Sequence, residues 1–433
     1  MVEFLPLRGL RYSPEYAGPN VYAPPYDVIT LEQQRRYLAR SPYNVVRLIL
    51  GPDPYDLDWH AGAAATLGAW VARGILTCDP SPRFYGYQQH FKLSDGHVYK
   101  RAGFIGRMRL RTWGMGVYRH EHTRTGPRED RLRLIRATRM NLSPVFGLYR
   151  DPCEELTRWL EPPLHPMLDF QDDEGVRQIF WPIEDDEAIA GISRSMAERE
   201  VVIADGHHRY ETALAYQAER RATDGNPPQP QLYDYVLIYL TASEGSGLHI
   251  LPSHRLILRE PAVQSERLLQ ALARDFDLFR VNGSASLSEA VRTAARGTVA
   301  IGLCLAQEGA WVLRLKDLGI AHRTAGERGL ADPEIAELDV CVLQHLILEP
   351  HLNISSEDLA SAERVSYVIH EEEACRQVHE GKAQAAFILN PTTVEQVWRA
   401  AKRGAVLPQK STYFYPKLLT GLVFNPLDAE WLD

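Results

Sequence analysis

The stretch Val201-Val-Ile-Ala-Asp-Gly-His-His-Arg-Tyr-Glu-Thr-Ala-Leu214 joins an apolar run to a helical pattern through a single glycine. The run Val201–Ala204 predicts a short buried strand that ends at Asp205, and Gly206 predicts the turn. A helix is then expected from about His208 to Ala222. The residues that this helix is predicted to bury follow its periodicity: Tyr210, Ala213, Leu214 and Ala218. A strand that turns directly into a helix indicates an α/β fold.

The rest of the chain repeats this mixture of strands and helices. Strands are predicted at Val45–Leu50, Phe84–Lys92, Val98–Leu110, Val145–Tyr149, Arg177–Trp181, Tyr233–Leu240, Leu248–Leu258, Thr298–Cys304 and Trp311–Leu315. Helices are predicted at residues 59–73, 185–198, 263–275, 286–296 and 338–348. The predicted fold class is therefore α/β with helices and strands mixed. We expect a catalytic region at residues 1–258 and a C-terminal α/β region at 259–433.

Composition limits the class of protein. The chain has 433 residues, of which 45% are hydrophobic and 24% charged, as in ordinary globular proteins. A formal net charge of -8 argues against a protein that coats nucleic acid. The five cysteines are widely separated, and we expect them to be reduced. Without a signal peptide pattern or a long apolar run, the expected location is the cytoplasm and no membrane partner is expected.

The turn after the predicted strand has the chemistry of a phosphate site. The first turn of a helix presents N–H groups and the positive end of the helix dipole to an anion. Gly206 allows the backbone to approach that anion closely, and Arg209 can add a charge-assisted contact. His207 and His208 supply donors or acid–base groups. The structural alternative is a strand–turn–helix in which Asp205 only caps the helix.

A second candidate site is the stretch Tyr118-Arg-His-Glu-His-Thr-Arg124. Glu121 lies among basic side chains, which favour its ionised form and suit a proton acceptor. His120 and His122 would share one face of an extended segment and form a zinc site together with His207 and His208. That reading requires residues from distant parts of the chain to converge.

Further cations flank these segments. Arg124, Arg128 and Arg131 stand at the start of a predicted helix and are candidates for a phosphate clamp, whereas Arg133 and Arg136 fit a solvated face. Near the C-terminus, Lys410-Ser411-Thr412 precedes Lys417 in a loop with aromatic neighbours. Lys-Ser-Thr resembles the end of a P-loop, but the glycines that a P-loop needs before it are absent.

Several ordered blocks resemble the bacterial and archaeal family catalogued as domain of unknown function 1015. They are Ala23-Pro-Pro-Tyr-Asp-Val28, His120-Glu121-x-Thr123-Arg124, Asp130-Arg131, Asn141, Ser143-Pro-Val-Phe146, Ala204-Asp-Gly-His-His-Arg209, Leu338-Asp-Val340 and Pro408 with Lys410-Ser-Thr-x-Phe-x-Pro-Lys417. The resemblance extends over nearly the whole chain. The stretch Arg364–His370 departs from a more glycine-rich pattern in that family.

The Asp205–Arg209 turn is in addition similar to that of the ParB/sulfiredoxin superfamily, whose turn cradles nucleotide phosphates. Free-serine kinases of that superfamily carry a closely similar turn and use a glutamate as base on the serine hydroxyl. This second resemblance implies a ParB/sulfiredoxin-like core. It also implies ATP or ADP as donor, and L-serine as the first acceptor to test.

The sequence thus predicts a phosphotransferase of the kinase type, with Mg²⁺ as cofactor. Glu121, Asp205 and His208 are the candidate catalytic residues, and Asp205 is the candidate magnesium ligand. The candidate phosphate- and nucleotide-binding residues are Gly206, His207, His208, Arg209, Arg124, Arg131, Lys410, Ser411, Thr412 and Lys417. A phosphoserine phosphatase and a non-catalytic nucleotide-binding switch protein are the alternatives. A nucleotide and a small molecule are the expected ligands, nucleic acid is not, and a homodimer is left open.

Overall fold

The computed structural model describes residues 1–53, 56, 58–121, 125–258, 264–281, 286–329, 332–361 and 364–432. The contacts between residues divide the chain into two units. The first comprises Met1–Arg119, Thr123–His249 and Pro416–Asp433, and the second comprises His120–His122 and Ile250–Tyr415. The sequence analysis predicted a boundary between two regions after residue 258. By contacts the second unit begins at Ile250, and the chain returns to the first unit at Pro416.

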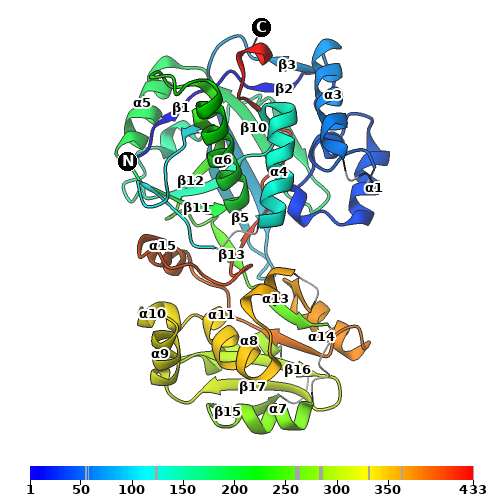
Figure 1. The fold of residues 1–433 in the computed structure, drawn as a ribbon, viewed down its shortest axis with the longest axis vertical. Coiled ribbons are helices and arrows are strands. Elements are labelled where there is room, and N and C mark those ends of the chain that lie inside the picture. Colours follow the sequence, from blue (N-terminus) through cyan, green and yellow to red (C-terminus); the bar gives the residue numbers. More distant parts are fainter. Residues whose placement is uncertain are drawn as a thin grey trace. The chain divides into compact units, whose positions relative to one another are not determined.

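The first unit is built on a large sheet that carries both parallel and antiparallel pairs (Figure 1). Its strand order is β6 (Val117–Tyr118), β11 (Val201–Asp205), β8 (Val145–Tyr149), β12 (Tyr235–Ala242), β5 (Val98–Arg109), β4 (Phe84–Lys92), β10 (Arg177–Ile183) and β9 (Leu168–Gln171), with β1 (Phe4–Leu5) on β5. β11 runs parallel to β6, and β12 runs parallel to β8. The short strands β2 (Leu10–Tyr12) and β3 (Leu76–Cys78) pair separately, as do β7 (Met140–Asn141) and β21 (Asn425–Pro426).

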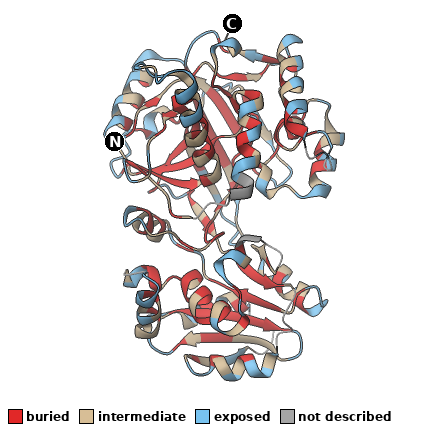
Figure 2. Ribbon diagram, in the orientation of Figure 1, coloured by how far each residue is buried: buried red, intermediate tan, exposed pale blue. Residues whose placement is uncertain are grey.

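The first unit also contains six α-helices among the described residues. They are α1 (Leu31–Arg40), α2 (Val46–Ile49), α3 (Trp59–Ala72), α4 (Thr125–Thr138), α5 (Asp186–Ala197) and α6 (His207–Thr223). α5 and α6 contribute Ile192, Met196, Tyr210 and Ala213 to the core that also holds Val201 and Ile203 of β11. The buried residues of the sheet appear as a continuous red band in Figure 2. β11 and the start of α6 are therefore anchored by apolar packing on both sides of the turn.

The second unit has an antiparallel sheet in the order β15 (Phe276–Val281), β17 (Gly309–Leu315), β16 (Ala300–Leu305), β19 (Ala385–Ile388), β14 (His254–Ile257) and β18 (Val365–Val368). Alternate residues of β16 pack into two separate hydrophobic cores. Ile301 and Leu303 belong to one core, and Ala300 and Cys304 belong to the other. This period of two is expected for a strand buried on both faces. A separate pair joins β13 (His249–Leu251) to β20 (Tyr413–Tyr415).

The helices of the second unit are α7 (Ser265–Leu272), α8 (Leu287–Ala294), α9 (Leu318–Glu327), α10 (Pro333–Ala336), α11 (Asp339–Val342), α12 (Glu349–Leu352), α13 (Ser356–Ser361), α14 (Glu371–His379) and α15 (Val394–Lys402). A π-helical turn, Leu343–Leu348, joins α11 to α12. Helices and strands are thus mixed in both units, which confirms the predicted α/β class.

Some local predictions were wrong. The run Val45–Leu50 was predicted as a strand, but Val46–Ile49 is helical, because the Asn44 side chain accepts a hydrogen bond from the Val46 N–H at 3.0 Å and starts a helical turn. Ala218 is exposed on α6, and Tyr216 is buried instead. The strand predicted over Leu248–Leu258 is divided between β13 and β14 at Pro252, which cannot donate to a strand ladder.

Candidate functional site

The turn between β11 and α6 has a conformation that glycine favours. Gly206 is the N-cap of α6 and lies in the left-handed region, with φ 87° and ψ 31°. Because glycine has no side chain, the helix has no side-chain hydrogen bond from its N-cap residue. A Cβ on Gly206 would lie 2.8 Å from Nε of Arg209. The first intrahelical hydrogen bond runs from the Tyr210 N–H to the Gly206 carbonyl at 3.0 Å. The missing side chain therefore lets the Arg209 guanidinium lie directly over the turn.

Asp205 stands at the centre of a small charged group in the first unit. Its Oδ1 accepts a hydrogen bond from the Gly206 N–H at 2.8 Å, so the carboxylate fixes the turn rather than capping α6 from the N-cap position. Its Oδ2 lies 3.1 Å from Nζ of Lys417 and 3.8 Å from Nη2 of Arg209. Thus the structure brings Lys417, which is more than 200 residues away in the sequence, to the Asp205–Arg209 turn.

The two histidines of the turn open α6. His207 is buried, with 5% of its surface exposed, whereas His208 is half-buried. The His208 carbonyl accepts a hydrogen bond from the Thr212 hydroxyl at 2.7 Å, one helical turn further on. Arg209 also donates to the carbonyl of Pro144, at the start of β8. Its side chain is thereby fixed between the turn and the neighbouring strand.

A buried cation, which the sequence analysis did not select, supports Lys417. Arg101 on β5 donates to the carbonyl of Pro416 and to the side chain of Gln89, and Gln89 donates to the Lys417 carbonyl at 2.9 Å. Burial lowers the pKa of Arg101, and the charge of Asp205 is among the groups that oppose this shift. Within β5, Arg101 is followed by the run Ala102–Gly106, which has no charged residue, and the sequence offered no stronger signal that this arginine is buried.

Arg131 shares a pocket with Arg209 in the first unit. The pocket has a volume of about 40 Å³, and its polar lining includes Asn141, Ser143 and Thr212. Arg131 is buried and donates to Asp130 and to the Ile49 carbonyl, and its guanidinium lies 4.2 Å from the ring centre of Tyr26. These contacts hold Arg131 firmly in place.

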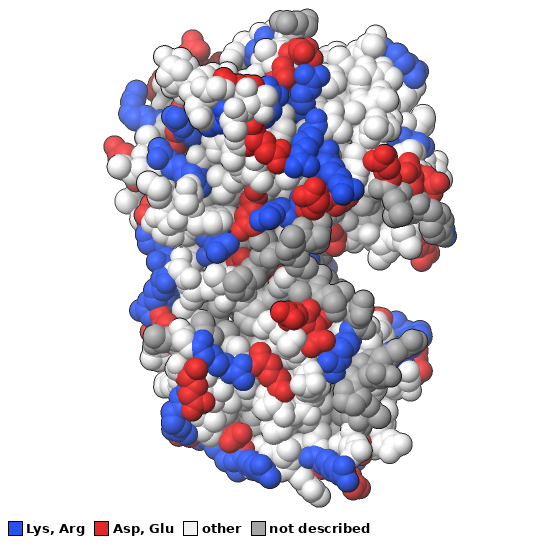
Figure 3. Space-filling view, in the orientation of Figure 1, with Lys and Arg blue, Asp and Glu red and all other residues white. Residues whose placement is uncertain are grey.

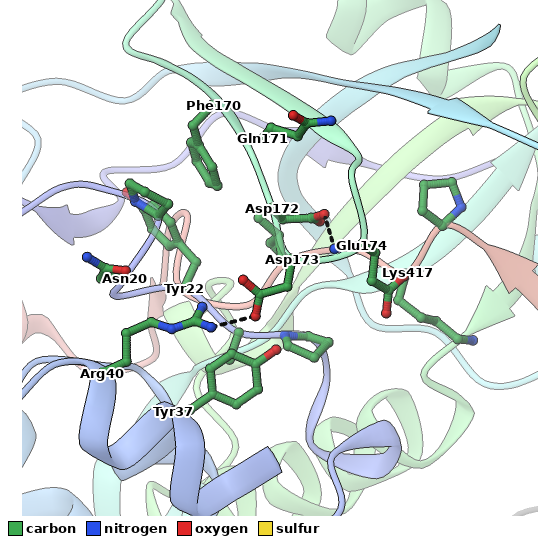
Figure 4. Close-up of a pocket in the computed structure, with 15 residues that line it drawn as sticks. Asn20, Tyr22, Tyr37, Arg40, Phe170, Gln171, Asp172, Asp173, Glu174 and Lys417 are labelled. Atoms are coloured by element: carbon green, nitrogen blue, oxygen red, sulfur yellow. Dashed lines mark hydrogen bonds and ion pairs between the residues drawn. The ribbon is translucent and has the colours of Figure 1, made fainter.

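A larger pocket of about 340 Å³ is lined in part by Lys417 (Figure 4). One wall is aromatic, because Tyr22 stacks on Phe170 with ring centres 5.5 Å apart. Asp172 and Glu174 line it, and burial raises the pKa of the Asp172 carboxyl group. Asp173 pairs with Arg40 at 2.6 Å.

Glu121 and the Lys410–Thr412 loop lie together in the second unit. Glu121 forms a parallel bridge with Leu407, and the Leu407 N–H donates to the His120 carbonyl at 2.8 Å. His120 is fully buried, and its Nε2 lies 3.0 Å from the Thr412 hydroxyl. Ser411 donates to the Pro408 carbonyl, and Lys410 has a left-handed φ of 54°. The candidate base and this loop are therefore neighbours, as the sequence could not show.

Arg124 and His122 lie outside the described residues. Over the described parts of the chain, no group of three or more His, Cys, Asp or Glu side chains is arranged to hold a metal ion.

Figure 3 shows basic and acidic side chains interspersed on the face that it draws. In the described helices, no segment is long and apolar enough to cross a membrane.

Comparison with solved structures gives distant similarities. A conserved hypothetical protein from Pyrococcus furiosus is 13% identical, with a TM-score of 0.34, and the match covers 71% of this chain and 90% of that one. A free serine kinase in complex with AMP is 13% identical, with a TM-score of 0.36 and coverage of 75% and 96%. C-terminally truncated SbnI from Staphylococcus aureus is 12% identical, with a TM-score of 0.34 and coverage of 74% and 91%.

Comparison of the sequence with curated proteins and with protein-family models gives two results. No curated protein matches the chain. The family model described as "Protein of unknown function (DUF1015)" matches residues 4–341, which include β11, the Asp205–Arg209 turn and Glu121. Since this match spans well over half of the sequence, the chain belongs to the DUF1015 family.

Proposed function

We propose that this protein is a nucleotide-dependent phosphotransferase that moves a phosphoryl group between ATP or ADP and a small hydroxylated metabolite. The observation that carries the proposal is the turn at Gly206. A left-handed glycine opens a helix of 17 residues, with the Arg209 and Lys417 cations beside it. A helix N-terminus with adjacent cations is a favourable environment for a phosphate group.

In this proposal Gly206, His207, His208 and Arg209 hold the phosphates of the nucleotide. The bare Cα of Gly206 lets the Arg209 guanidinium lie against the turn, and this guanidinium can make two parallel hydrogen bonds to phosphate oxygens. Lys417 supplies a second positive charge close to the turn. Neutralising charge as the phosphoryl group moves is the main catalytic task in such reactions.

Asp205 fits the donor chemistry of Mg²⁺. It offers a carboxylate of intermediate exposure at the end of β11, next to the turn. Mg²⁺ usually takes one or two protein carboxylates and completes its shell with phosphate oxygens and water. When bound, the ion would supply further positive charge to the phosphates.

Glu121 is proposed as the base. Its carboxylate takes the proton of the acceptor hydroxyl, the hydroxyl oxygen forms a bond to phosphorus, and the shortened nucleotide leaves with the electrons of the broken P–O bond. Arg124, Arg131, Lys410 and Lys417 are the cations proposed to stabilise the transferred charge. L-serine is the first acceptor to test, because the Asp205–Arg209 turn is similar to that of free-serine kinases.

Phosphorus NMR of the purified protein tests this function directly. The protein is incubated with Mg²⁺, with ATP or ADP, and with a set of hydroxylated metabolites that includes L-serine. A phosphorylated acceptor together with a shortened nucleotide supports the proposal. Release of inorganic phosphate from phosphoserine would show a phosphatase, and nucleotide binding without turnover would show a switch protein.

A further inference from the structure

Asn141 is a buried polar residue of the first unit that has no part in the proposal so far. It lies on β7, and only 5% of its surface is exposed. Its Oδ1 accepts hydrogen bonds from the Leu237 N–H on β12 and from the side-chain amide of Asn425 on β21, both at 3.0 Å. Because a backbone N–H can only donate, these contacts determine which side of the Asn141 amide is the oxygen.

The nitrogen of the same amide has no partner. Nδ2 of Asn141 carries two N–H donors, and among the described residues none accepts a hydrogen bond from them. A buried donor without an acceptor is costly unless a water molecule or a ligand accepts from it. The two contacts of the oxygen also fix the direction in which these donors point. Asn141 therefore holds a free, oriented donor group in the interior of the first unit.

Asn141 lines the pocket of about 40 Å³ that Arg131 and Arg209 share. Three of the five N–H groups of Arg131 donate to Asp130 and to the Ile49 carbonyl, and the other two have no acceptor among the described residues. Most of the remaining lining is apolar, and no Asp or Glu side chain of the described residues lines the pocket. Its polar character therefore comes mainly from hydrogen-bond donors.

A ligand of this pocket has to be small and to accept several hydrogen bonds. The volume of about 40 Å³ accommodates about three water-sized groups at ~10–15 Å³ each, which is too little for a nucleobase or a chain of phosphates. A single oxyanion group fits both requirements, because its oxygens accept charge-assisted hydrogen bonds from guanidinium groups. Gly206 and His207 do not line the pocket, so it lies beside the helix N-terminus and is joined to it through Arg209.

We propose that Asn141 binds, together with Arg131 and Arg209, the phosphoryl group that the enzyme transfers. The assignment to this group rests on the proposed function, in which Arg131 already stabilises the transferred charge. Asn141 adds two neutral donors whose direction is fixed before the ligand binds, and such preorganised donors stabilise charge without having to reorient. A carboxylate of the acceptor could use the same donors, and binding measurements separate the two sources.

Calorimetry of the full-length protein with inorganic phosphate tests the pocket without turnover. Asn141→Asp keeps the oxygen to which Leu237 and Asn425 donate, but it replaces the free amide by a second carboxylate oxygen. The affinity for phosphate should fall about tenfold or more, because a hydrogen bond is lost and a repulsion is added. Asn226→Asp, which adds the same charge to an exposed loop after α6, should bind phosphate like wild type. Equal affinities for Asn141→Asp and wild type overturn the inference, as does a wild-type protein that does not bind phosphate.

Two further ligands identify the source of the oxyanion. AMP has no phosphoryl group to transfer, so Asn141→Asp should bind AMP like wild type and the donor nucleotide, ATP or ADP, more weakly. Equal losses for AMP and the donor would assign Asn141 to another part of the nucleotide and overturn the inference. L-serine carries a carboxylate as its oxyanion. A loss of affinity for L-serine without a loss for phosphate would assign the pocket to the acceptor and also overturn it.

A second variant covers the case in which the buried charge prevents folding. Asn141→Ser removes the amide without adding a charge, and it should weaken phosphate binding by a smaller factor than Asn141→Asp. Unchanged binding in folded Asn141→Ser contradicts the inference.

The proposed function can fail separately from this pocket. Phosphate binding that depends on Asn141, without phosphorylation of any acceptor, refutes the transferase and leaves the phosphate pocket in place. Turnover with an unchanged kcat in Asn141→Asp leaves the transferase in place and refutes the role of Asn141.

Discussion

At the scale of single residues, the charged group around Asp205 joins parts of the chain that are more than 200 residues apart. Lys417 reaches Asp205 from the C-terminal segment of the first unit, and Arg209 reaches it from one turn along α6. Arginine and lysine side chains next to a helix N-terminus can make charge-assisted hydrogen bonds to a bound anion.

Arg209→Ala should weaken nucleotide binding more than tenfold, which is about 1.4 kcal/mol, without unfolding the protein. A charge-assisted contact to phosphate is typically worth at least that much. Calorimetry with ATP and ADP measures the change. Arg220→Ala, which alters an arginine in the last turn of the same helix, should leave the affinity unchanged. Equal affinities for Arg209→Ala and wild type would rule out the phosphate turn.

Glu121→Gln should nearly abolish turnover while nucleotide affinity stays within a few fold. Glutamine keeps the shape of the side chain but cannot accept the hydroxyl proton, and general-base catalysis is commonly worth ~10²–10⁴ in rate. Steady-state kinetics and calorimetry on the same preparation measure both quantities. A fall in kcat of less than tenfold would exclude Glu121 as the base and make Asp205 the next candidate.

At the scale of elements, the β11–α6 connection combines a conformational requirement with a steric one. Gly206→Ala forces a Cβ into the left-handed region at φ 87° and towards the Arg209 guanidinium. We expect a loss of about 1–2 kcal/mol in unfolding free energy from the backbone strain, together with weaker nucleotide binding. Gly225→Ala is the matched control, because Gly225 has φ 72° but open space around it. It should lose stability and keep its affinity, and parallel loss of affinity in both variants would contradict the steric argument.

Asp339, at the start of α11, makes stability depend on pH. Its Oδ2 accepts hydrogen bonds from the backbone N–H and the side-chain amide of Asn390, both at 2.9 Å, and burial raises the pKa of Asp339 to about 6. Because the folded state holds this proton more tightly than the unfolded state, stability should fall as pH rises from about 4 to 6.

Asp339→Asn keeps an acceptor for Asn390 but cannot ionise. Relative to this variant, wild type should lose roughly 1–3 kcal/mol of unfolding free energy between pH 4 and pH 7, at 1.36 kcal/mol per unit of pKa. Urea unfolding at a series of pH values measures this difference. Parallel stability curves for the two proteins would contradict the raised pKa.

At the scale of the whole molecule, the candidate residues are shared between the two contact units. The Asp205–Arg209 turn and Lys417 belong to the first, and Glu121 with Lys410–Thr412 belongs to the second. The chain passes from one unit to the other at both ends of the segment Ile250–Tyr415. Each unit by itself therefore holds only part of the residues assigned to phosphoryl transfer.

Phosphoryl transfer of the proposed kind should depend on a divalent metal ion. Turnover should require added Mg²⁺ or Mn²⁺, because phosphoryl transfer uses a divalent ion to neutralise phosphate charge. Elemental analysis of the purified protein should find far less than one zinc per chain. Stoichiometric zinc that is lost on substitution of His120 or His207 would instead favour a metal-dependent hydrolase.

Elements with strong local signals could be predicted from the sequence. β8 and β4 span the predicted strands Val145–Tyr149 and Phe84–Lys92, and β5 covers Val98–Arg109 of the predicted strand Val98–Leu110. The Asp205-Gly206 turn was also local, because glycine at a strand–helix junction marks a left-handed conformation. Family membership followed from ordered blocks of residues and was confirmed over residues 4–341.

The contacts between distant residues could not be predicted from the sequence. The short apolar run at Val45–Leu50 suits a strand or a helix equally, and the Asn44 side chain settled it in favour of a helix. The pairing of Lys417 with Asp205 and the burial of Arg255 beside the Gln409 carbonyl depend on long-range contacts. Spacing along the chain carries no information about such contacts, because they form only when packing of the apolar cores brings the segments together.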